Sequence, residues 1–300
     1  MKITRTLYII TVCLLAAAVL SLSAAEKLKV LIVDGQNNHN WRTTTPMLKW
    51  ILEDCGRFTV AVSTTPPEKS SPDLWKEWHP TFTNYDAVLL NYNGERWPAR
   101  VNQQFVEYVR NGGGLVVVHA ADNAFPDWPE FNDMIAVGGW GGRNEQNGPM
   151  IRWRDGKQVL DRTPGDGGTH GAAGPYVVNI IVTNHPITMG LPSGWRHAKD
   201  ELYGRLRGPC KNFTVLANAF SAKETGGTGE VEPVLLVINY GQGRVFHDVL
   251  GHDADSMADT GFQCTLQRGT EWAATGKVTL PAPKPEAMAI DKVVMHQPPR

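Results

Sequence analysis

Four apolar stretches of the sequence are each followed by side chains that suit acid–base chemistry or ligand binding. These side chains are His39, Asn93, His119 with Asp122, and His252. In an open parallel sheet, ligands bind beyond the carboxyl ends of the strands. If the four stretches are strands of one such sheet, these residues meet in one site. A single histidine at a strand end is more often structural, so the prediction depends on the four occurring together.

Two kinds of chemistry fit such a site once Glu201 is included. In the first, His119, Glu201 and His252, together with His39 or Asp122, hold a divalent metal ion such as zinc with a position left for water or a sugar oxygen. The sequence has no HExxH motif, so the ligands would come from separate loops. In the second, Asp122 or Glu201 abstracts a proton and His119 or His252 donates one, without a metal. Glu201 could also serve only as a helix cap or in a buried ion pair.

The chain contains ten tryptophans, which favour a carbohydrate ligand because the apolar face of a pyranose stacks on an aromatic ring. We expect about half of them to pack in the core. Those expected in loops beside the site are Trp41, Trp97, Trp128 and Trp140, and the arginines expected to reach sugar hydroxyls are Arg143, Arg152 and Arg154. The predicted substrate-binding residues are His39, Trp41, Asn93, Trp140 and Arg143.

The apolar patterns predict an α/β domain that would hold these residues. The expected strands are 28–33, 58–62, 87–91, 115–118, 150–153, 176–182, 214–217, 234–238 and 244–250. The expected helices are 43–55, one beginning at Pro98, and one beginning near Ser256 and ending at Gly276, with a long loop at 64–83. The βαβαβ order of the first part predicts a parallel sheet with right-handed crossovers.

Residues 1–25 have the layout of a signal peptide, with a positive start, a short apolar run and small residues before Glu26. We therefore expect a periplasmic or extracellular protein without a membrane span after cleavage, with one domain over 26–280 and a Pro-rich tail over 281–300. The net charge of −1 argues against a nucleic-acid partner. The three remaining cysteines form no CxxC pair and are expected to be free thiols. The sequence does not fix the oligomeric state.

Several segments resemble the ThuA-like (trehalose utilisation) family. They are 113–121 (GGLVVVHAA), 185–187 (HPI), 200–204 (DELYG), 243–253 (GRVFHDVLGHD) and 261–273, in family order. The resemblance implies a flavodoxin-like three-layer fold, with a mostly parallel central sheet and helices on both faces, related to class I glutamine amidotransferases. Those enzymes carry a nucleophilic cysteine at a strand-to-helix elbow, where this chain has His119. We therefore expect no amidotransferase activity.

The resemblance and the residues together favour an exported enzyme of carbohydrate catabolism. The expected reaction is an acid–base or metal-assisted isomerisation, elimination or hydrolysis of a sugar such as a keto-disaccharide, because a ketone acidifies its neighbouring C–H. One alternative is a sugar-binding module without catalysis. Another is a structural or interaction domain in which the histidines only support the fold.

Overall fold

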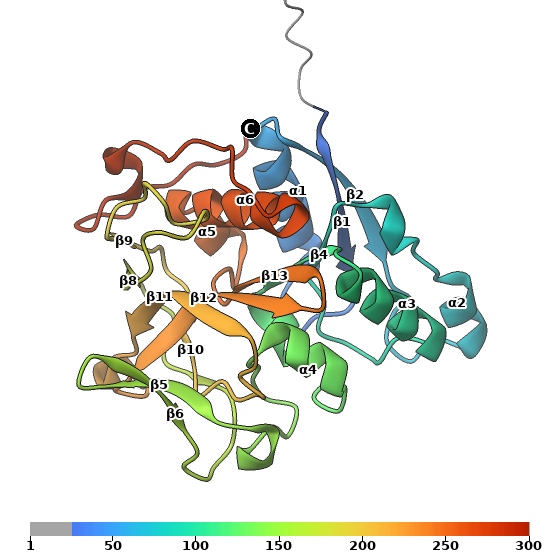
Figure 1. Cartoon of the computed structure of the whole chain (residues 1–300), viewed down its shortest axis with the longest axis horizontal. Coiled ribbons are helices and arrows are strands. Elements are labelled where there is room, and N and C mark those ends of the chain that lie inside the picture. The colour runs from blue at the N-terminus through green and yellow to red at the C-terminus, as the bar shows by residue number, and fades with distance from the viewer. Residues whose placement is uncertain (1–25, 300) are drawn as a thin grey trace, which may run out of the picture.

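A nine-stranded sheet forms the centre of the structure, which is a computed structural model that describes residues 26–299 (Figure 1). The predicted signal peptide lies outside the described residues. In spatial order the strands are β2 (Phe58–Thr64), β1 (Leu28–Asp34), β3 (Ala87–Leu90), β4 (Gly114–Val118), β13 (Gly243–Asp248), β12 (Val231–Tyr240), β11 (Phe213–Phe220), β8 (Val177–Ile180) and β9 (Gly194–Arg196).

The sheet is mixed, so the prediction of a mostly parallel sheet is wrong. Strands β2, β1, β3, β4 and β13 are parallel to one another. The pairs β13–β12, β12–β11, β11–β8 and β8–β9 are antiparallel. Strands buried on both faces are apolar along their whole length in either orientation, and therefore apolar runs do not reveal direction.

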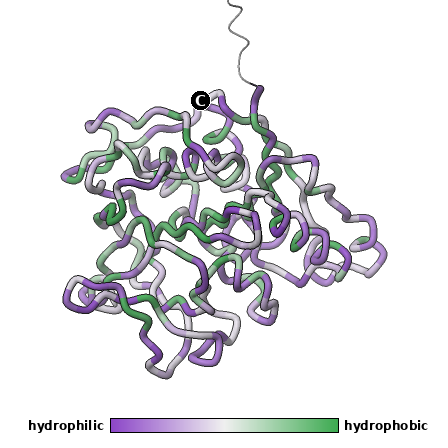
Figure 2. The backbone as a smooth tube through the Cα atoms, viewed as in Figure 1, coloured by the Kyte–Doolittle hydropathy of each residue, from purple (hydrophilic) through white to green (hydrophobic). Residues whose placement is uncertain are grey.

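Helices cover both faces of the sheet (Figure 1). They are α1 (Trp41–Asp54), α2 (Pro72–Glu77), α3 (Ala99–Arg110), α4 (Pro129–Ile135), α5 (Ala254–Met257) and α6 (Thr260–Thr275). Alternate residues of β1 serve the two faces, because side chains of a strand point in opposite directions in turn. Val30 and Ile32 pack in the core under α1, α5 and α6, whereas Leu31 and Val33 pack in the core under α3 and α4. Figure 2 shows this apolar interior as the green central strands.

The sequence between the parallel and antiparallel parts forms two small antiparallel sheets. One pairs β5 (Met150–Arg154) with β6 (Lys157–Asp161), and the other pairs β7 (Thr169–His170) with β10 (Tyr203–Gly204). Short 3-10 helices are η1 (Phe82–Asn84), η2 (His119–Asn123), η3 (Glu145–Asn147), η4 (Lys223–Thr225) and η5 (Pro285–Met288). Helix α2 and η1 lie in the segment expected to be only a loop.

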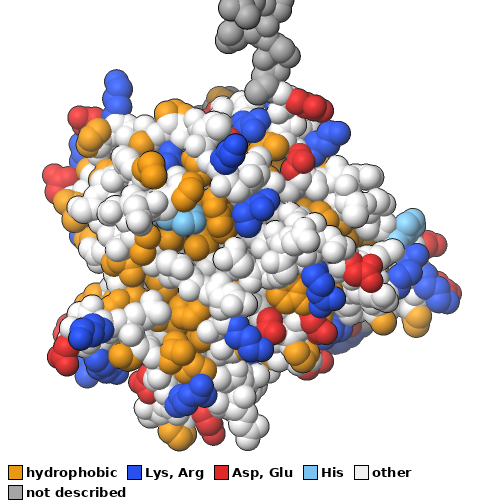
Figure 3. All heavy atoms as spheres, in the orientation of Figure 1, with side chains coloured by type: hydrophobic (Ala, Val, Ile, Leu, Met, Phe, Trp, Pro, Cys, Tyr) orange, Lys and Arg blue, Asp and Glu red, His pale blue; other side chains and the backbone are white. Residues whose placement is uncertain are grey.

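The described part of the C-terminal segment packs on α6. The backbone N–H of Thr260 donates to the carbonyl of Val294, and the side chain of Gln263 donates to the carbonyl of His296. No helix among residues 26–299 is long and apolar enough to cross a membrane. The face drawn in Figure 3 carries charged side chains of both signs in scattered positions.

Candidate metal centre

Four residues from separate parts of the chain meet at the carboxyl ends of the parallel strands. They are His39, His119, Glu201 and His252, and each offers one ligand atom within 4.8 Å of the others. His39 follows β1, His119 follows β4 directly, and His252 follows β13. Glu201 instead comes from the connection between β9 and β10. The structure therefore brings all three residues of the predicted metal set together, and it adds His39 rather than Asp122.

His119 presents a free nitrogen lone pair to this cluster. Its Nδ1 lies 2.8 Å from the carbonyl oxygen of Val249. A carbonyl can only accept a hydrogen bond, and therefore Nδ1 carries the proton and Nε2 is left unprotonated. Nε2 is buried 3.9 Å from Oε2 of Glu201, and it has no hydrogen-bond partner among residues 26–299. A metal ion would satisfy this nitrogen.

The backbone at His119 is strained, with φ of 46° at the first residue of η2. A left-handed conformation in a residue other than glycine costs on the order of 1–3 kcal/mol and occurs most often at functional sites. This turn places the imidazole, which is 2% exposed, in the cluster at the end of β4. Burial raises the pKa of both Cys210 and Cys264 to about 12, so both are neutral thiols.

The charges in the cluster favour an ionised glutamate among imidazoles. Burial by itself would raise the pKa of Glu201, but the neighbouring imidazoles of His119 and His252 outweigh it and lower the pKa. The Oε2 atom of Glu201 lies 3.1 Å from Nδ1 of His252, and this contact raises the pKa of His252. Burial, followed by the neighbouring His119 and His252, lowers the pKa of His39 to about 4, so His39 is a neutral potential ligand at pH 7.

A carboxylate beneath the cluster fixes the backbone of two of its residues. Oδ1 of Asp200 accepts hydrogen bonds from the backbone N–H groups of Glu201, at 2.8 Å, and His252, at 3.1 Å. Oδ2 accepts from the N–H of Gly251 and from Nε2 of His197, both at 2.8 Å. Asp200 is 1% exposed. It therefore ties the β9–β10 connection to the loop after β13.

His197 connects Asp200 to the start of α6. Its Nδ1 lies 3.1 Å from Oδ1 of Asp259, which also caps α6 by accepting from the N–H of Phe262. Burial would lower the pKa of His197, but Asp200 and Asp259 outweigh it and raise the pKa to about 10. His197 is thus a buried imidazolium between two carboxylates. We call His197, Asp200 and Asp259 the buried network.

Aromatic side chains form one wall of the cluster. The Oη atom of Tyr203 lies 3.0 Å from Nε2 of His39, and the Tyr203 ring lies 4.0 Å from the ring of His119. Trp140 packs against Tyr203 with ring centroids 4.6 Å apart and is half-buried. His170 stands at the rim, with its side chain 39% exposed and Nε2 3.8 Å from Oε1 of Glu201. Tyr203 itself is 1% exposed, so the solvent-accessible rings of this wall are those of Trp140 and His170.

Two of the predicted site residues lie outside the cluster. Asp122 is fully buried, with Oδ2 3.2 Å from Nε2 of His247. Arg143 is 1% exposed, and its guanidinium donates to the carbonyls of Asn123, Ala124 and Gly139. Both side chains are used in holding the η2 region together, so neither is placed to meet a substrate.

The remaining predicted residues divide between the rim and the core. Asn93 is half-buried and donates to Asn38, the neighbour of His39, at 2.7 Å. Trp41 is half-buried beside the guanidinium of Arg42. Trp97 and Trp128 are both 2% exposed and pack in an aromatic core with other rings. Of the four tryptophans expected beside the site, only Trp41 and Trp140 are accessible to a ligand.

Sequence reasoning missed the contribution of Tyr203, Asp200, His197 and His170. Tyr203 and His170 reach the cluster because β7 and β10, each two residues long, pair there. Strands this short leave no periodicity to read. Asp200 and Tyr203 do lie inside the DELYG segment, which was the available signal.

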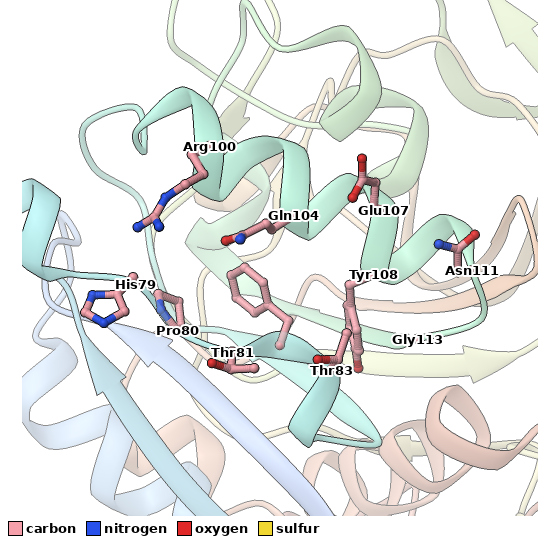
Figure 4. A pocket seen from close by; sticks show the side chains of 11 residues that line it. His79, Pro80, Thr81, Thr83, Arg100, Gln104, Glu107, Tyr108, Asn111 and Gly113 are labelled. Atoms are coloured by element: carbon pink, nitrogen blue, oxygen red, sulfur yellow. The ribbon is translucent and has the colours of Figure 1, made fainter.

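The pocket drawn in Figure 4 lies elsewhere. It has a volume of about 450 Å³ and lies between α3, with Arg100, Gln104, Glu107 and Tyr108, and residues 79–83. Gly113 lines it just before β4 begins, whereas His119 follows the end of β4. It therefore lies at the opposite end of the strand from the cluster, and it contains none of the four clustered residues.

The fold and the cluster define an α/β protein with a candidate metal centre at the strand ends. The chain belongs to the ThuA family, described as trehalose utilisation, whose model matches residues 29–273. It is similar to the crystal structure of a ThuA-like protein from Parabacteroides merdae, with 47% identity, 90% of this chain and 98% of that chain covered, and a TM-score of 0.87. A ThuA-like protein from Bacteroides uniformis, at 18% identity, 86% and 95% coverage and a TM-score of 0.55, shares the fold. A comparison with curated proteins gives no match.

Proposed function

We propose that this ThuA-family protein is a metal-dependent enzyme of carbohydrate catabolism that acts outside the cytoplasm. The observation that carries the proposal is the convergence of three imidazoles and one carboxylate within 4.8 Å, with Nε2 of His119 buried and unpartnered. Buried polar atoms are nearly always satisfied in native proteins. A divalent ion would satisfy Nε2 and would also hold three imidazoles close together at neutral pH.

The ligand set indicates the type of metal. Imidazole nitrogen suits zinc and other first-row transition metals, whereas magnesium and calcium prefer oxygen ligands. The side chains of Glu201 and His252 are 15% and 27% exposed, so solvent and a small ligand can reach the cluster. An ion held there would polarise a sugar carbonyl or lower the pKa of a bound water.

A carbohydrate substrate is supported by the family description and by the aromatic wall. Trp140 is half-buried beside the cluster and offers a ring on which a sugar can stack, whereas Tyr203, which is 1% exposed, packs against it. A keto sugar suits the cluster best, because a metal held by His39, His119, Glu201 and His252 would supply Lewis acidity, and a ketone already acidifies its neighbouring C–H. Nδ1 of His170 donates to the carbonyl of Gly171, so its Nε2 is a candidate proton acceptor at the rim. Isomerisation and elimination begin from such activation, and elimination followed by addition of water amounts to hydrolysis.

Metal analysis of the purified protein tests the proposal. We expect about one equivalent of a transition metal in the wild type after zinc, manganese or cobalt is added and excess is removed, and little in His119→Ala or Glu201→Gln. His296→Ala is the matched control, because His296 is an exposed histidine paired with Asp54. Equal metal content in all variants, or none in the wild type, would rule out the metal centre.

Turnover of disaccharides and their 3-keto forms then separates an enzyme from a binding module. An enzyme loses turnover with His119→Ala while its thermal unfolding shows that it is folded. A binding module shows sugar-dependent stabilisation that Trp140→Ala removes and His119→Ala leaves unchanged.

A further inference from the structure

A second hollow, lined by arginines, lies between the β5–β6 hairpin and the chain after β10. It has a volume of about 410 Å³ and is lined by Arg152, Arg154, Arg205 and Arg207, together with Asp161, Asp166, Glu230, Thr163 and Thr228 and their neighbours. We call it the arginine pocket. None of the four residues of the metal centre lines it.

Two of its guanidinium groups are buried without a full set of oxygen acceptors. Arg207 is 1% exposed; Nη1 and Nη2 donate to the carbonyls of Gly148 and Thr163, while Nε has no partner. Arg152 is 3% exposed, and its Nη2 contacts only the sulfur of Met150, a weak acceptor, at 3.2 Å. Leaving a buried donor unsatisfied costs about 1–3 kcal/mol. Oxygen atoms of a ligand would remove part of this cost.

The acidic residues around the pocket neutralise only two of the four arginines. Glu230 and Asp161 lie 2.6 and 3.6 Å from the guanidinium of Arg154. Arg152 pairs with the buried Glu232 at 2.5 Å. Within the described part of the chain, neither Arg205 nor Arg207 has a carboxylate within 4.0 Å.

Arg205 and Arg207, which have no paired carboxylate, both add to the positive potential in the pocket. Burial lowers the pKa of Arg207, and the nearby Arg152 and Arg205 lower it further, although Glu145 and Asp161 act in the opposite direction. Arg205 is exposed and can meet a ligand from solvent. Asp166 is exposed at the same rim and pairs with none of the four arginines within 4.0 Å. Arg205 and Arg207 would attract an anion placed here, and Asp166 would repel it.

We propose that the arginine pocket binds an oxyanion, and that this oxyanion is the carboxylate or sulfate group of an acidic saccharide. A guanidinium matches two oxygens of such a group with parallel hydrogen bonds. The pocket is joined to the proposed metal centre through β7 and β10. Tyr203 of β10 contacts His39, and Arg205 follows it by two residues. The backbone carbonyl of Arg205 accepts a hydrogen bond from the N–H of Gly168, which lies two residues before His170. The oxyanion site stands independently of the metal centre, whereas the saccharide assignment rests on the proposed function.

Titration calorimetry tests the site in a buffer free of sulfate and phosphate. The probes are sodium sulfate, sodium glucuronate and neutral glucose. We expect saturable binding of glucuronate that is about tenfold weaker in Arg205→Gln, since one charge-assisted contact is lost, with partial recovery in Arg205→Lys. Asp166→Asn should strengthen binding severalfold. Arg100→Gln, an exposed arginine on α3, is the matched control and should bind as the wild type does.

Each outcome bears on a separate part of the proposal. Binding of glucuronate in His119→Ala at wild-type strength places the anion outside the metal centre. Binding of sulfate alone supports the oxyanion site and overturns the saccharide assignment. No saturable anion binding by the wild type, or equal affinities in Arg205→Gln and Arg100→Gln, overturns the site. Metal content measured on the same samples shows whether the proposed metal centre has failed separately.

Discussion

Histidines and carboxylates form two layers in this molecule, and the layers differ in how completely their polar atoms are hydrogen-bonded. In the upper layer, the proposed metal centre, Nε2 of His119 has no hydrogen-bond partner among the described residues, and Glu201 and His252 are partly exposed. In the lower layer, the buried network, Asp200 accepts four hydrogen bonds and His197 is held between two carboxylates.

The comparison shows that residue type alone does not distinguish a reactive site from a structural one. Both layers contain the same side chains within a few residues of each other, such as Asp200 beside Glu201. The difference lies in unsatisfied lone pairs and in access from solvent. A fully paired buried group stabilises and positions its neighbours, whereas an accessible group with an unused lone pair can bind a metal or a proton.

The largest expected effect is on metal affinity when the upper layer is changed. His119→Ala or Glu201→Gln removes a ligand, and we expect the affinity for zinc to fall by more than the roughly 100-fold upper figure for loss of a supporting residue. Calorimetric titration of the metal-free protein measures this. An affinity within threefold of the wild type would show that the upper layer is not a metal centre.

A smaller effect on metal affinity is expected when the lower layer is changed at Asp200. Asp200→Asn replaces one acceptor oxygen by an N–H₂ group that faces backbone N–H donors, so the loops carrying Glu201 and His252 lose their fixed relation. We expect affinity for zinc to fall about 10–100-fold, the range for residues that orient metal ligands.

A control separates positioning from general instability in this variant. Asp259→Asn also weakens the buried network, but Asp259 contacts neither Glu201 nor His252 directly, and therefore it should lower stability with less effect on zinc affinity. If both variants lose metal affinity in proportion to their stability, Asp200 has no specific positioning role.

The pair of Asp122 and His247 lies in neither layer and provides a buried change that should spare metal binding. Both side chains are fully buried, and Asp122 lies apart from the cluster. Asp122→Asn should lower the free energy of unfolding by about 1–3 kcal/mol, the range for leaving a buried hydrogen-bonding group unsatisfied. Urea unfolding measures the stability, and metal titration should give the wild-type affinity. Loss of metal binding without loss of stability would show that Asp122 belongs to the metal site.

The sequence predicted the parallel half of the fold and the part of the site that depends on it. Apolar runs such as residues 115–118 mark buried strands, and strand ends in a parallel sheet share one edge. This rule explains why His39, His119 and His252 could be grouped in advance. It gives no direction for the strands beyond β13, where the antiparallel pairing was missed.

The two layers could not be separated from sequence because side-chain direction depends on local backbone detail. His119 and Asp122 are three residues apart, yet only His119 lies in the cluster, and the turn between them begins with φ of 46° at His119. No sequence pattern indicates such a conformation in a residue other than glycine. Arg143 was predicted to bind substrate, but its guanidinium donates to the backbone carbonyls of Asn123 and Ala124. This too depends on local backbone detail that the sequence does not indicate.

The smallest expected effect concerns His185, a histidine that belongs to neither layer. Burial lowers its pKa to about 4, and its unprotonated Nδ1 accepts a hydrogen bond from the N–H of Ile187 at 3.2 Å. Because the folded pKa is below the unfolded value of about 6.5, the unfolded chain takes up the proton first as pH falls. Stability is therefore lost between about pH 6.5 and 4, by on the order of 1 kcal/mol after allowing for solvent screening of this half-buried group.

Urea unfolding of the wild type and His185→Asn at pH 7 and pH 4.5 measures this loss of stability, since groups in the two layers titrate equally in both proteins. The wild type should lose more stability than the variant, and equal losses would show that His185 does not contribute to acid sensitivity.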